Sequence, residues 1–177
     1  MTDDDLLGEL LGRASRRLAA YGYLLTGSQH AGEDLVQDAI VKVFVRKRRI
    51  PNVAAAEGYV RAAMRSLHVD RMRRETVWRR LAPGQIARDE VPDEADRIAT
   101  ADAIGRALAT LSPRQRTAVV LRYYDDLTVA DVAHQMRLAT GTVKRYLSDA
   151  LDRLAVEVGA EVFDAERIAV VDMEGRS

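Results

Sequence analysis

The sequence predicts an all-α protein of two small helical domains joined by an extended acidic linker. Apolar residues recur at helical spacing along most of the chain, whereas the alternating apolar and polar runs that indicate strands are almost absent. Only four of the 177 residues are prolines, and two of them lie in a segment that separates the two helical parts. With 47% hydrophobic and 31% charged residues, the composition is typical of a globular protein.

Three helices are expected in the N-terminal domain. Gly27 can provide a left-handed stop after the first helix, and Pro51 disfavours helix at the residue before it. The helices span about 4–26, 31–48, and 53 to 74 or beyond, and their short connections predict one bundle. Their expected buried residues are Leu6, Leu7, Leu10, Leu11, Leu18, Tyr21 and Leu25; Leu35, Val36, Ile40, Val43 and Phe44; and Tyr59, Val60, Ala63, Met64, Leu67 and Met72.

The C-terminal domain carries stronger helix-boundary signals. Ser112, Pro113 and Gln115 form the pattern of a capping box with proline at the first helical position. After the break "YDDLT", Thr128 can cap a short helix. The expected helices span about 101–110, 113–123, 129–136 and 140–154. Segment 82–97, with two prolines, one glycine and five acids, reads as the linker between the domains.

The charge is unevenly distributed, although 27 basic and 27 acidic residues cancel overall. Residues 41–80 contain 12 Lys or Arg and three acids, a net of +9, whereas residues 82–100 carry −3 and residues 101–177 carry −2. A solvated helix face of mixed charge is the plain alternative for such a segment. The size of the excess favours an anionic partner that binds locally.

Several classes of chemistry find no support in the sequence. Cysteine is absent, which excludes disulfides, thiol catalysis and cysteine-based zinc sites. The three histidines, His30, His68 and His134, lie in different segments, and no phosphate-binding glycine motif is present. We therefore expect no enzyme activity, no metal and no cofactor. The acidic N-terminus is unlike a secretory signal and no apolar run approaches 18 residues, so we expect a cytoplasmic protein without membrane contact.

Residues 127–154 have the form of a helix-turn-helix, in which the small Ala133 faces a second helix whose Val143 and Leu147 turn inward. Spacing alone also allows a structural hairpin. In a DNA-binding module, hydrogen-bond donors on the outer N-terminal part of the second helix would meet base edges and phosphates. The donor-rich side chains at that place are Thr140, Thr142, Lys144, Arg145 and Ser148.

An arginine-rich segment at residues 58–80 is a second candidate for nucleic-acid binding. Guanidinium groups at this density suit phosphates, and a neighbouring aromatic ring can stack on an unpaired base. Tyr59 is either such a ring or a core residue, whereas we expect Trp78 to pack over the bundle. The arginines are Arg61, Arg65, Arg71, Arg73, Arg74, Arg79 and Arg80.

Taken in order, these motifs resemble the bacterial sigma-70 family, in its extracytoplasmic-function group and the actinobacterial SigE-like subgroup. "AYGYLLTGSQHAGEDLVQDAIVKVF" resembles regions 2.1 and 2.2, "YVRAAMRSLHVDRMRR" resembles region 2.4, and "LATLSPRQRTAVVLRYYDDLTVADVAHQM" with "GTVKRYLSDALDRL" resembles regions 4.1 and 4.2. The resemblance covers about residues 6–155. It implies region 2 at 1–81, a linker at 82–100 and region 4 at 101–158, with a tail of unassigned role at 159–177.

The resemblance implies a sigma factor that binds core RNA polymerase, recognises the −10 and −35 promoter elements and helps open promoter DNA. The implied contacts are the clamp helices of the largest polymerase subunit and the flap of the second-largest, and an anti-sigma factor is a further implied partner. The helix expected at 31–48 begins with acids and ends with bases. A plain alternative to a binding role is that these charges complement the helix dipole, each by about 0.3–1 kcal/mol. The implied polymerase-binding residues are Glu33, Asp34, Leu35, Gln37 and Asp38.

The same resemblance assigns the promoter contacts. The loop from Arg49 to Ala56 and the helix after it would read the −10 element, where strand opening exposes bases that a protein pocket can hold. The implied −10 residues are Arg49, Asn52, Tyr59, Arg61, Arg65, Ser66, Arg73 and Arg74. The implied −35 residues are Thr140, Thr142, Lys144, Arg145 and Ser148.

Five residues depart from the family pattern. Arg137 stands where relatives usually have glycine, and a left-handed backbone there would cost on the order of 1 kcal/mol. Ala139 replaces a frequent serine cap, and Ser66 replaces a frequent asparagine. Asp149 and Asp152 occupy positions that are often basic, where a carboxylate repels phosphate.

Two alternative functions stay open. The first is a helix-turn-helix regulator that binds duplex DNA without polymerase, and the second is a decoy that binds polymerase but binds promoter DNA poorly. The motif "EDLVQD" and the acidic linker favour the sigma factor over the regulator, whereas Asp149 and Asp152 keep the decoy open.

Overall fold

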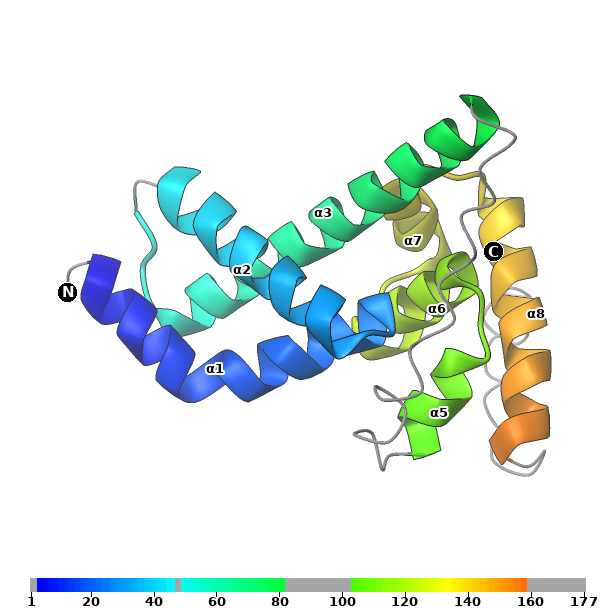
Figure 1. Ribbon diagram of the computed structural model, residues 1–177, viewed down its shortest axis with the longest axis horizontal. Helices are drawn as coiled ribbons and strands as arrows, with labels where there is room; N and C mark the ends of the chain where they lie inside the picture. Colours follow the sequence, from blue (N-terminus) through cyan, green and yellow to red (C-terminus); the bar gives the residue numbers. More distant parts are fainter. Residues whose placement is uncertain (1–2, 47–48, 82–102, 159–177) are drawn as a thin grey trace. The chain divides into compact units, whose positions relative to one another are not determined.

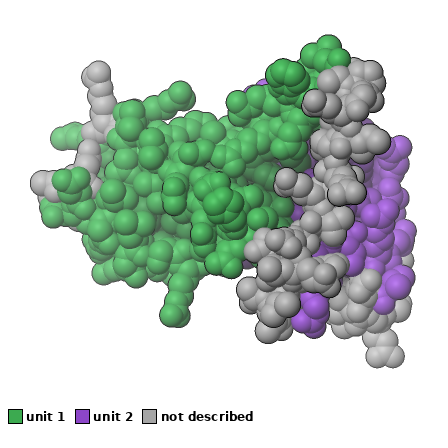
Figure 2. Space-filling model, viewed as in Figure 1, with its two compact units in different colours: residues 1–99 green, residues 100–177 purple. Residues whose placement is uncertain are grey.

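The computed structural model describes residues 3–46, 49–81 and 103–158 as helices and short connections (Figure 1). Every regular element in these ranges is helical, which confirms the predicted all-α class. The chain divides into two compact units, residues 1–99 and residues 100–177 (Figure 2). The predicted linker and the tail at 159–177 lie outside the described residues.

Unit 1 is a bundle of three helices, α1 (Asp3–Thr26), α2 (Gln29–Arg46) and α3 (Val53–Leu81), each of which packs against the other two. The prediction that Leu11 is buried is wrong, because 43% of this residue is exposed. Burying a large aliphatic side chain stabilises a fold by roughly 1.5–3 kcal/mol, so the apolar stripes hold the helices together. The fully buried large side chains are Leu10, Leu18, Tyr21, Leu25, Leu35, Val60 and Met64.

The turn between α1 and α2 follows from its small polar residues. Gly27 has φ of 75°, as predicted for a left-handed stop. Ser28 Oγ accepts a hydrogen bond of 3.3 Å from the backbone N–H of Ala31, so this hydroxyl caps α2. Because of this cap, α2 begins at Gln29, two residues before the predicted start.

The backbones of α1 and α2 touch where two glycines meet. A Cβ atom placed on Gly22 would lie 2.6 Å from the carbonyl oxygen of Gly32, and one on Gly32 would lie 2.7 Å from the nitrogen of Tyr23. Both distances are shorter than a side chain tolerates. The close approach of the two helices therefore depends on the missing side chains.

Unit 2 contains α5 (Ala103–Ala109), α6 (Pro113–Val119), one π-helical turn η1 (Val120–Tyr124), α7 (Val129–Met136) and α8 (Thr140–Val158). The capping box is confirmed: Ser112 Oγ accepts from the N–H of Gln115, and the Gln115 side chain accepts from the N–H of Ser112. Thr128 caps α7 as predicted, accepting from the N–H of Asp131 at 3.1 Å. The predicted helix to residue 123 is thus α6 continued by η1.

Side chains of α6 connect it to its neighbours. Arg116 is only 4% exposed, and its Nε donates to the carbonyl of Leu108 at 3.1 Å. The same carbonyl also accepts from the N–H of Leu111 at 3.2 Å, so both bonds close the end of α5. Arg114 donates to the Tyr146 hydroxyl of α8 at 3.3 Å. Arg153 of α8 donates to Oε1 of Gln115 at 3.2 Å. The two bonds between α6 and α8 hold α8 in place, which fixes the orientation of its outer face.

Within the described residues, we find no helix long and apolar enough to cross a membrane.

Candidate functional site

The polar residues predicted for polymerase binding form one surface on α2. Glu33, Asp34, Gln37 and Asp38 are all exposed, and their spacing of three and four residues places them on one side of the helix. We call these four residues the acidic surface. Leu35, which was predicted with them, is fully buried in the core of unit 1. Its side chain holds α2 in the bundle and is not available to a partner in this structure.

Two members of the acidic surface are paired within α2 itself. Gln29 Nε2 donates to Glu33 Oε1 at 3.0 Å, and His30 Nε2 lies 3.7 Å from Asp34 Oδ2. Both pairs join residues four apart at an exposed site, so they are worth only a few tenths of a kcal/mol. A partner that approaches this surface can therefore displace them at little cost.

Asp38 is held differently, by a residue of another helix. The Nη2 of Arg71, on α3, lies 2.5 Å from Asp38 Oδ2. The side chain of Asp38 remains 60% exposed and that of Arg71 34% exposed. Sequence reasoning identified both residues separately but did not pair them, because a contact between residues 33 apart leaves no local signal.

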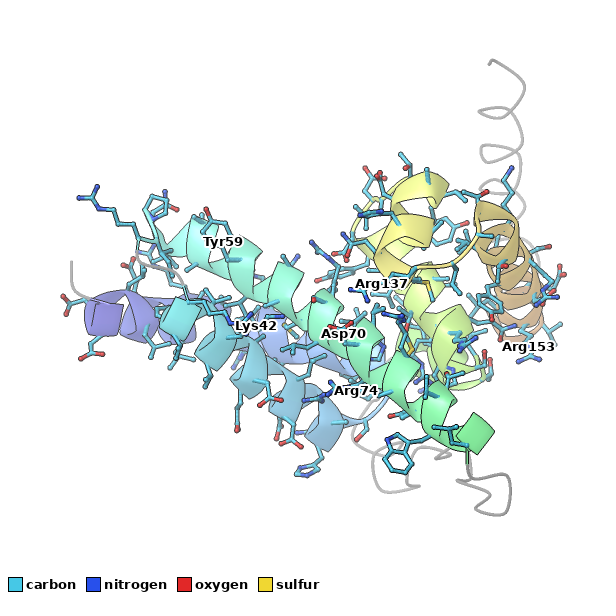
Figure 3. All side chains as sticks on the ribbon, turned by 90° about the horizontal axis from the view of Figure 1, so that it is seen from above. Lys42, Tyr59, Asp70, Arg74, Arg137 and Arg153 are labelled. Atoms are coloured by element: carbon cyan, nitrogen blue, oxygen red, sulfur yellow. The ribbon has the colours of Figure 1, made fainter. Side chains whose placement is uncertain are left out.

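The candidate −10 residues divide between two sides of α3. Tyr59, Ser66 and Arg73 are seven residues apart, about two helical turns each, and Arg74 follows on the same side. Ser66, Arg73 and Arg74 are exposed, whereas Tyr59 is half-buried. Figure 3 labels Tyr59 and Arg74 along α3.

Arg61 lies on another side of α3 and is engaged within the bundle. Its guanidinium carbon lies 5.4 Å from the centre of the Tyr21 ring of α1, and its Nη2 lies 3.7 Å from Glu57 Oε1. Arg65, four residues on, is half-buried on the same side. A role for Arg61 in DNA binding would therefore compete with its packing against α1.

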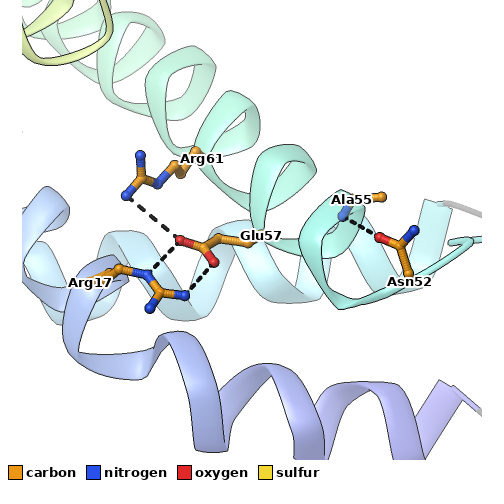
Figure 4. A network of polar contacts seen from close by, with 5 residues as sticks. All are labelled: Arg17, Asn52, Ala55, Glu57 and Arg61. Atoms are coloured by element: carbon orange, nitrogen blue, oxygen red, sulfur yellow. Dashed lines mark hydrogen bonds and ion pairs between the residues drawn. The ribbon is translucent and has the colours of Figure 1, made fainter.

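Glu57 joins α1 to α3 through an ion pair with Arg17 (Figure 4). Arg17 donates from Nε to Oε1 at 3.0 Å and from Nη2 to Oε2 at 2.7 Å, a two-point geometry that favours the carboxylate. The hydrogen bonds from Arg17 lower the pKa of Glu57, partial burial opposes them, and the charges of Arg17 and Arg61 lower it further. This network fixes the start of α3.

The loop before α3 contributes two exposed candidates, Arg49 and Asn52. Asn52 already has a structural role, because its Oδ1 accepts a hydrogen bond of 2.9 Å from the N–H of Ala55 and caps α3 (Figure 4).

The far end of α3 departs from expectation at Trp78. We predicted that this ring packs over the bundle, but 70% of it is exposed, which makes that prediction wrong. Val77 and Leu81 beside it are also exposed.

The turn between α7 and α8 has the geometry of a Schellman motif. Arg137 has φ of 53° and ψ of 48°, the left-handed conformation that glycine adopts most easily. Its N–H donates to the carbonyl of His134 at 3.1 Å, and the N–H of Leu138 donates to the carbonyl of Ala133 at 2.9 Å. The backbone requirement that we suspected at Arg137 is thus present.

The two helices of this motif pack as predicted. Ala133, Val143 and Leu147 are buried between them. On the outer side of α8, Thr140, Lys144, Arg145 and Ser148 are exposed and Thr142 is half-buried. Asp149 and Asp152 are also exposed, so this side of α8 carries both signs of charge.

Comparison with known proteins places these features in a family. Residues 101–154 match the family model described as sigma-70, region 4. The RNA polymerase sigma-E factor of Streptomyces antibioticus is 30% identical over 139 residues, covering 77% of this chain and 75% of the relative. The ECF RNA polymerase sigma factor SigL of Mycobacterium tuberculosis H37Rv is 30% identical over 143 residues, covering 76% of this chain and 78% of the relative.

This chain belongs to the extracytoplasmic-function sigma factors. The resemblance inferred from its motifs is confirmed, including its likeness to the SigE type. A solved structure supports the fold of this sigma factor: the sigma factor RpoE of Bartonella quintana, in complex with the anti-sigma factor NepR, aligns with a TM-score of 0.51 at 21% identity. That alignment covers 86% of this chain and 96% of the other.

Proposed function

We propose that this sigma factor binds core RNA polymerase through the acidic surface of α2 and binds promoter DNA through α3 and α8. The observation that carries the proposal is the separation of charge within unit 1. An exposed acidic surface lies on α2, whereas exposed arginines lie on α3. Such a division lets one small bundle bind a cationic protein surface and an anionic nucleic acid together.

Each part of the chain has the role of the family region that it resembles. Residues 1–81 act as region 2 on the −10 element, residues 101–158 act as region 4 on the −35 element, and residues 82–100 link them inside the polymerase. The protein works by binding and carries out no chemistry of its own, in the cytoplasm where polymerase acts. The RpoE structure was solved with an anti-sigma factor, which supports a partner of that kind here.

On α8, the candidate −35 residues have side chains that can form hydrogen bonds with base edges and phosphates. Arg145 and Lys144 suit guanine edges or phosphates, and Ser148 and the threonines donate to either. The nearby carboxylate of Asp149 suits a cytosine amino group and disfavours phosphate. All of these side chains except the half-buried Thr142 are exposed on the outer side of α8, which leaves them open to a major groove.

The test is run-off transcription with purified core polymerase from a Streptomyces host and a genomic fragment library. The wild-type protein should produce new transcripts, and Asp34→Arg/Gln37→Ala should abolish them by weakening polymerase binding. Asp4→Arg, a charge reversal at an exposed residue of α1 outside the acidic surface, is the matched control and should keep activity.

The remaining outcomes separate the alternatives. Salt-sensitive binding of duplex DNA without polymerase binding would leave the plain regulator. Polymerase binding without transcripts would favour the decoy, which the exposed Asp149 and Asp152 on α8 make a specific second candidate. In that case Asp149→Arg/Asp152→Arg should create promoter activity.

A further inference from the structure

The ion pair between Arg71 and Asp38 joins the two surfaces to which the proposed function assigns different partners. Asp38 belongs to the acidic surface of α2, and Arg71 belongs to the arginine-rich part of α3. Glu33 and Asp34 are paired with residues of α2 itself. Among these three carboxylates, Asp38 is therefore the one that is paired with a residue of α3, the helix proposed to bind nucleic acid.

We propose that Arg71 is a further phosphate-binding residue, which Asp38 holds in the free protein and which polymerase binding releases. A cationic side chain of the polymerase that approaches the acidic surface competes with Arg71 for the Asp38 carboxylate. Once displaced, the guanidinium of Arg71 is available to a phosphate of promoter DNA. This inference rests on the proposed function, because it needs a cationic partner on α2 and an anionic one on α3.

The geometry makes the exchange feasible. Asp38 is 60% exposed, so an incoming cation can reach it without unfolding the bundle. Arg74 lies three residues after Arg71 and therefore on the same part of the helix surface. Arg74 is exposed, and its Nε donates to the backbone carbonyl of Asp70. A released Arg71 would thus join a neighbouring arginine, and two guanidinium groups can bind phosphate oxygens at adjacent positions.

The coupling between polymerase binding at Asp38 and DNA binding at Arg71 must be reciprocal and small. If polymerase favours the released state of Arg71, then DNA bound to Arg71 favours polymerase by the same factor. An exposed ion pair is worth at most about 1 kcal/mol, which corresponds to a change in affinity of about two- to five-fold. The ion pair between Arg71 and Asp38 would therefore change the affinities for polymerase and DNA by a small factor and would not prevent either from binding.

The first measurement uses the full chain and a fluorescein-labelled, mixed-sequence single-stranded oligonucleotide at low salt, read by fluorescence anisotropy. Asp38→Asn should bind the oligonucleotide about two- to five-fold more tightly than wild type, because Arg71 is free. Asp34→Asn removes the same charge from the same surface without releasing an arginine of α3, and it should change affinity less. In an Arg71→Ala background, Asp38→Asn should add no more affinity than Asp34→Asn does.

The proposal is overturned if Asp38→Asn and Asp34→Asn act equally, or if the gain persists without Arg71. The second measurement is the affinity for core polymerase, which Arg71→Ala should raise by a similar factor only while Asp38 is present. A wild-type chain that binds no core polymerase would contradict the proposed function. The oligonucleotide measurement would still decide whether Asp38 restrains Arg71.

Discussion

Arg137 shows how a single residue can carry backbone strain within a DNA-binding motif. It occupies the left-handed position of the Schellman motif between α7 and α8, where its Cβ is disfavoured. The strain is offset by two backbone hydrogen bonds that end α7 and by the buried contacts between α7 and α8. The left-handed backbone at this position is therefore a physical reason why glycine would suit it better than arginine.

Arg137→Gly should raise the free energy of unfolding by about 0.5–1 kcal/mol, because glycine adopts the left-handed backbone without strain. Urea denaturation followed by circular dichroism would measure this change. Gln135→Gly, at an exposed helical position of the same helix, is the matched control and should lower the free energy of unfolding by about 1 kcal/mol. Equal destabilisation by both variants would show that no strain is present at Arg137.

Glu57 should make the stability of unit 1 depend on pH. Its folded pKa lies below the ordinary value of 4.5, mainly because of the hydrogen bonds from Arg17. The stabilisation is therefore fully present above pH 4.5 and is lost as the pH falls through the lowered pKa. Glu57→Gln should cost about 1 kcal/mol at pH 7, measured by urea unfolding, and the cost should shrink below pH 4.5. A cost that is constant between pH 7 and pH 3 would contradict this assignment.

At the scale of the elements, the crossing of α1 and α2 determines where the acidic surface is presented. The crossing requires the close contact between Gly22 and Gly32, since a Cβ on either would overlap the other backbone. Gly32 lies one residue before Glu33, the first member of the acidic surface. Packing at the glycine contact therefore positions that surface.

Gly32→Ala should destabilise the protein by about 1–3 kcal/mol, because the extra methyl group overpacks the crossing and forces α2 away from α1. The free energy of unfolding from urea denaturation is the measurement. Gly12→Ala, in α1 with open space around it, should instead add up to about 1 kcal/mol through helix propensity. If Gly32→Ala proves as stable as wild type, the two backbones do not touch as described.

Across the whole molecule, the positive charge is concentrated in one part of unit 1. The excess of nine bases in residues 41–80 falls on the end of α2, the following loop and α3, whereas residues 101–177 carry a slight net negative charge. Nonspecific attraction to nucleic acid should therefore come mainly from unit 1. Unit 2 would contribute sequence readout through the mixed charges on the outer side of α8.

The helices and their boundaries could be predicted from the sequence because their causes are local. The capping box at Ser112, the cap at Thr128 and the stop at Gly27 each involve residues within four positions of one another. The periodic apolar residues likewise predicted which sides of the helices are buried, although Leu11 was wrong. The order of the motifs was sufficient to identify the family.

Other features depended on which helix lies opposite, and only the tertiary structure decided them. Leu35 is buried although its neighbours form the acidic surface, and Trp78 near the end of α3 is exposed. The pairings of Arg17 with Glu57 and of Arg71 with Asp38 join residues 40 and 33 positions apart. By itself, the sequence determined the helical class, the helix boundaries and the family. The tertiary structure decided which charged residues remain available to partners, because charge pairing depends on distance in space and not along the chain.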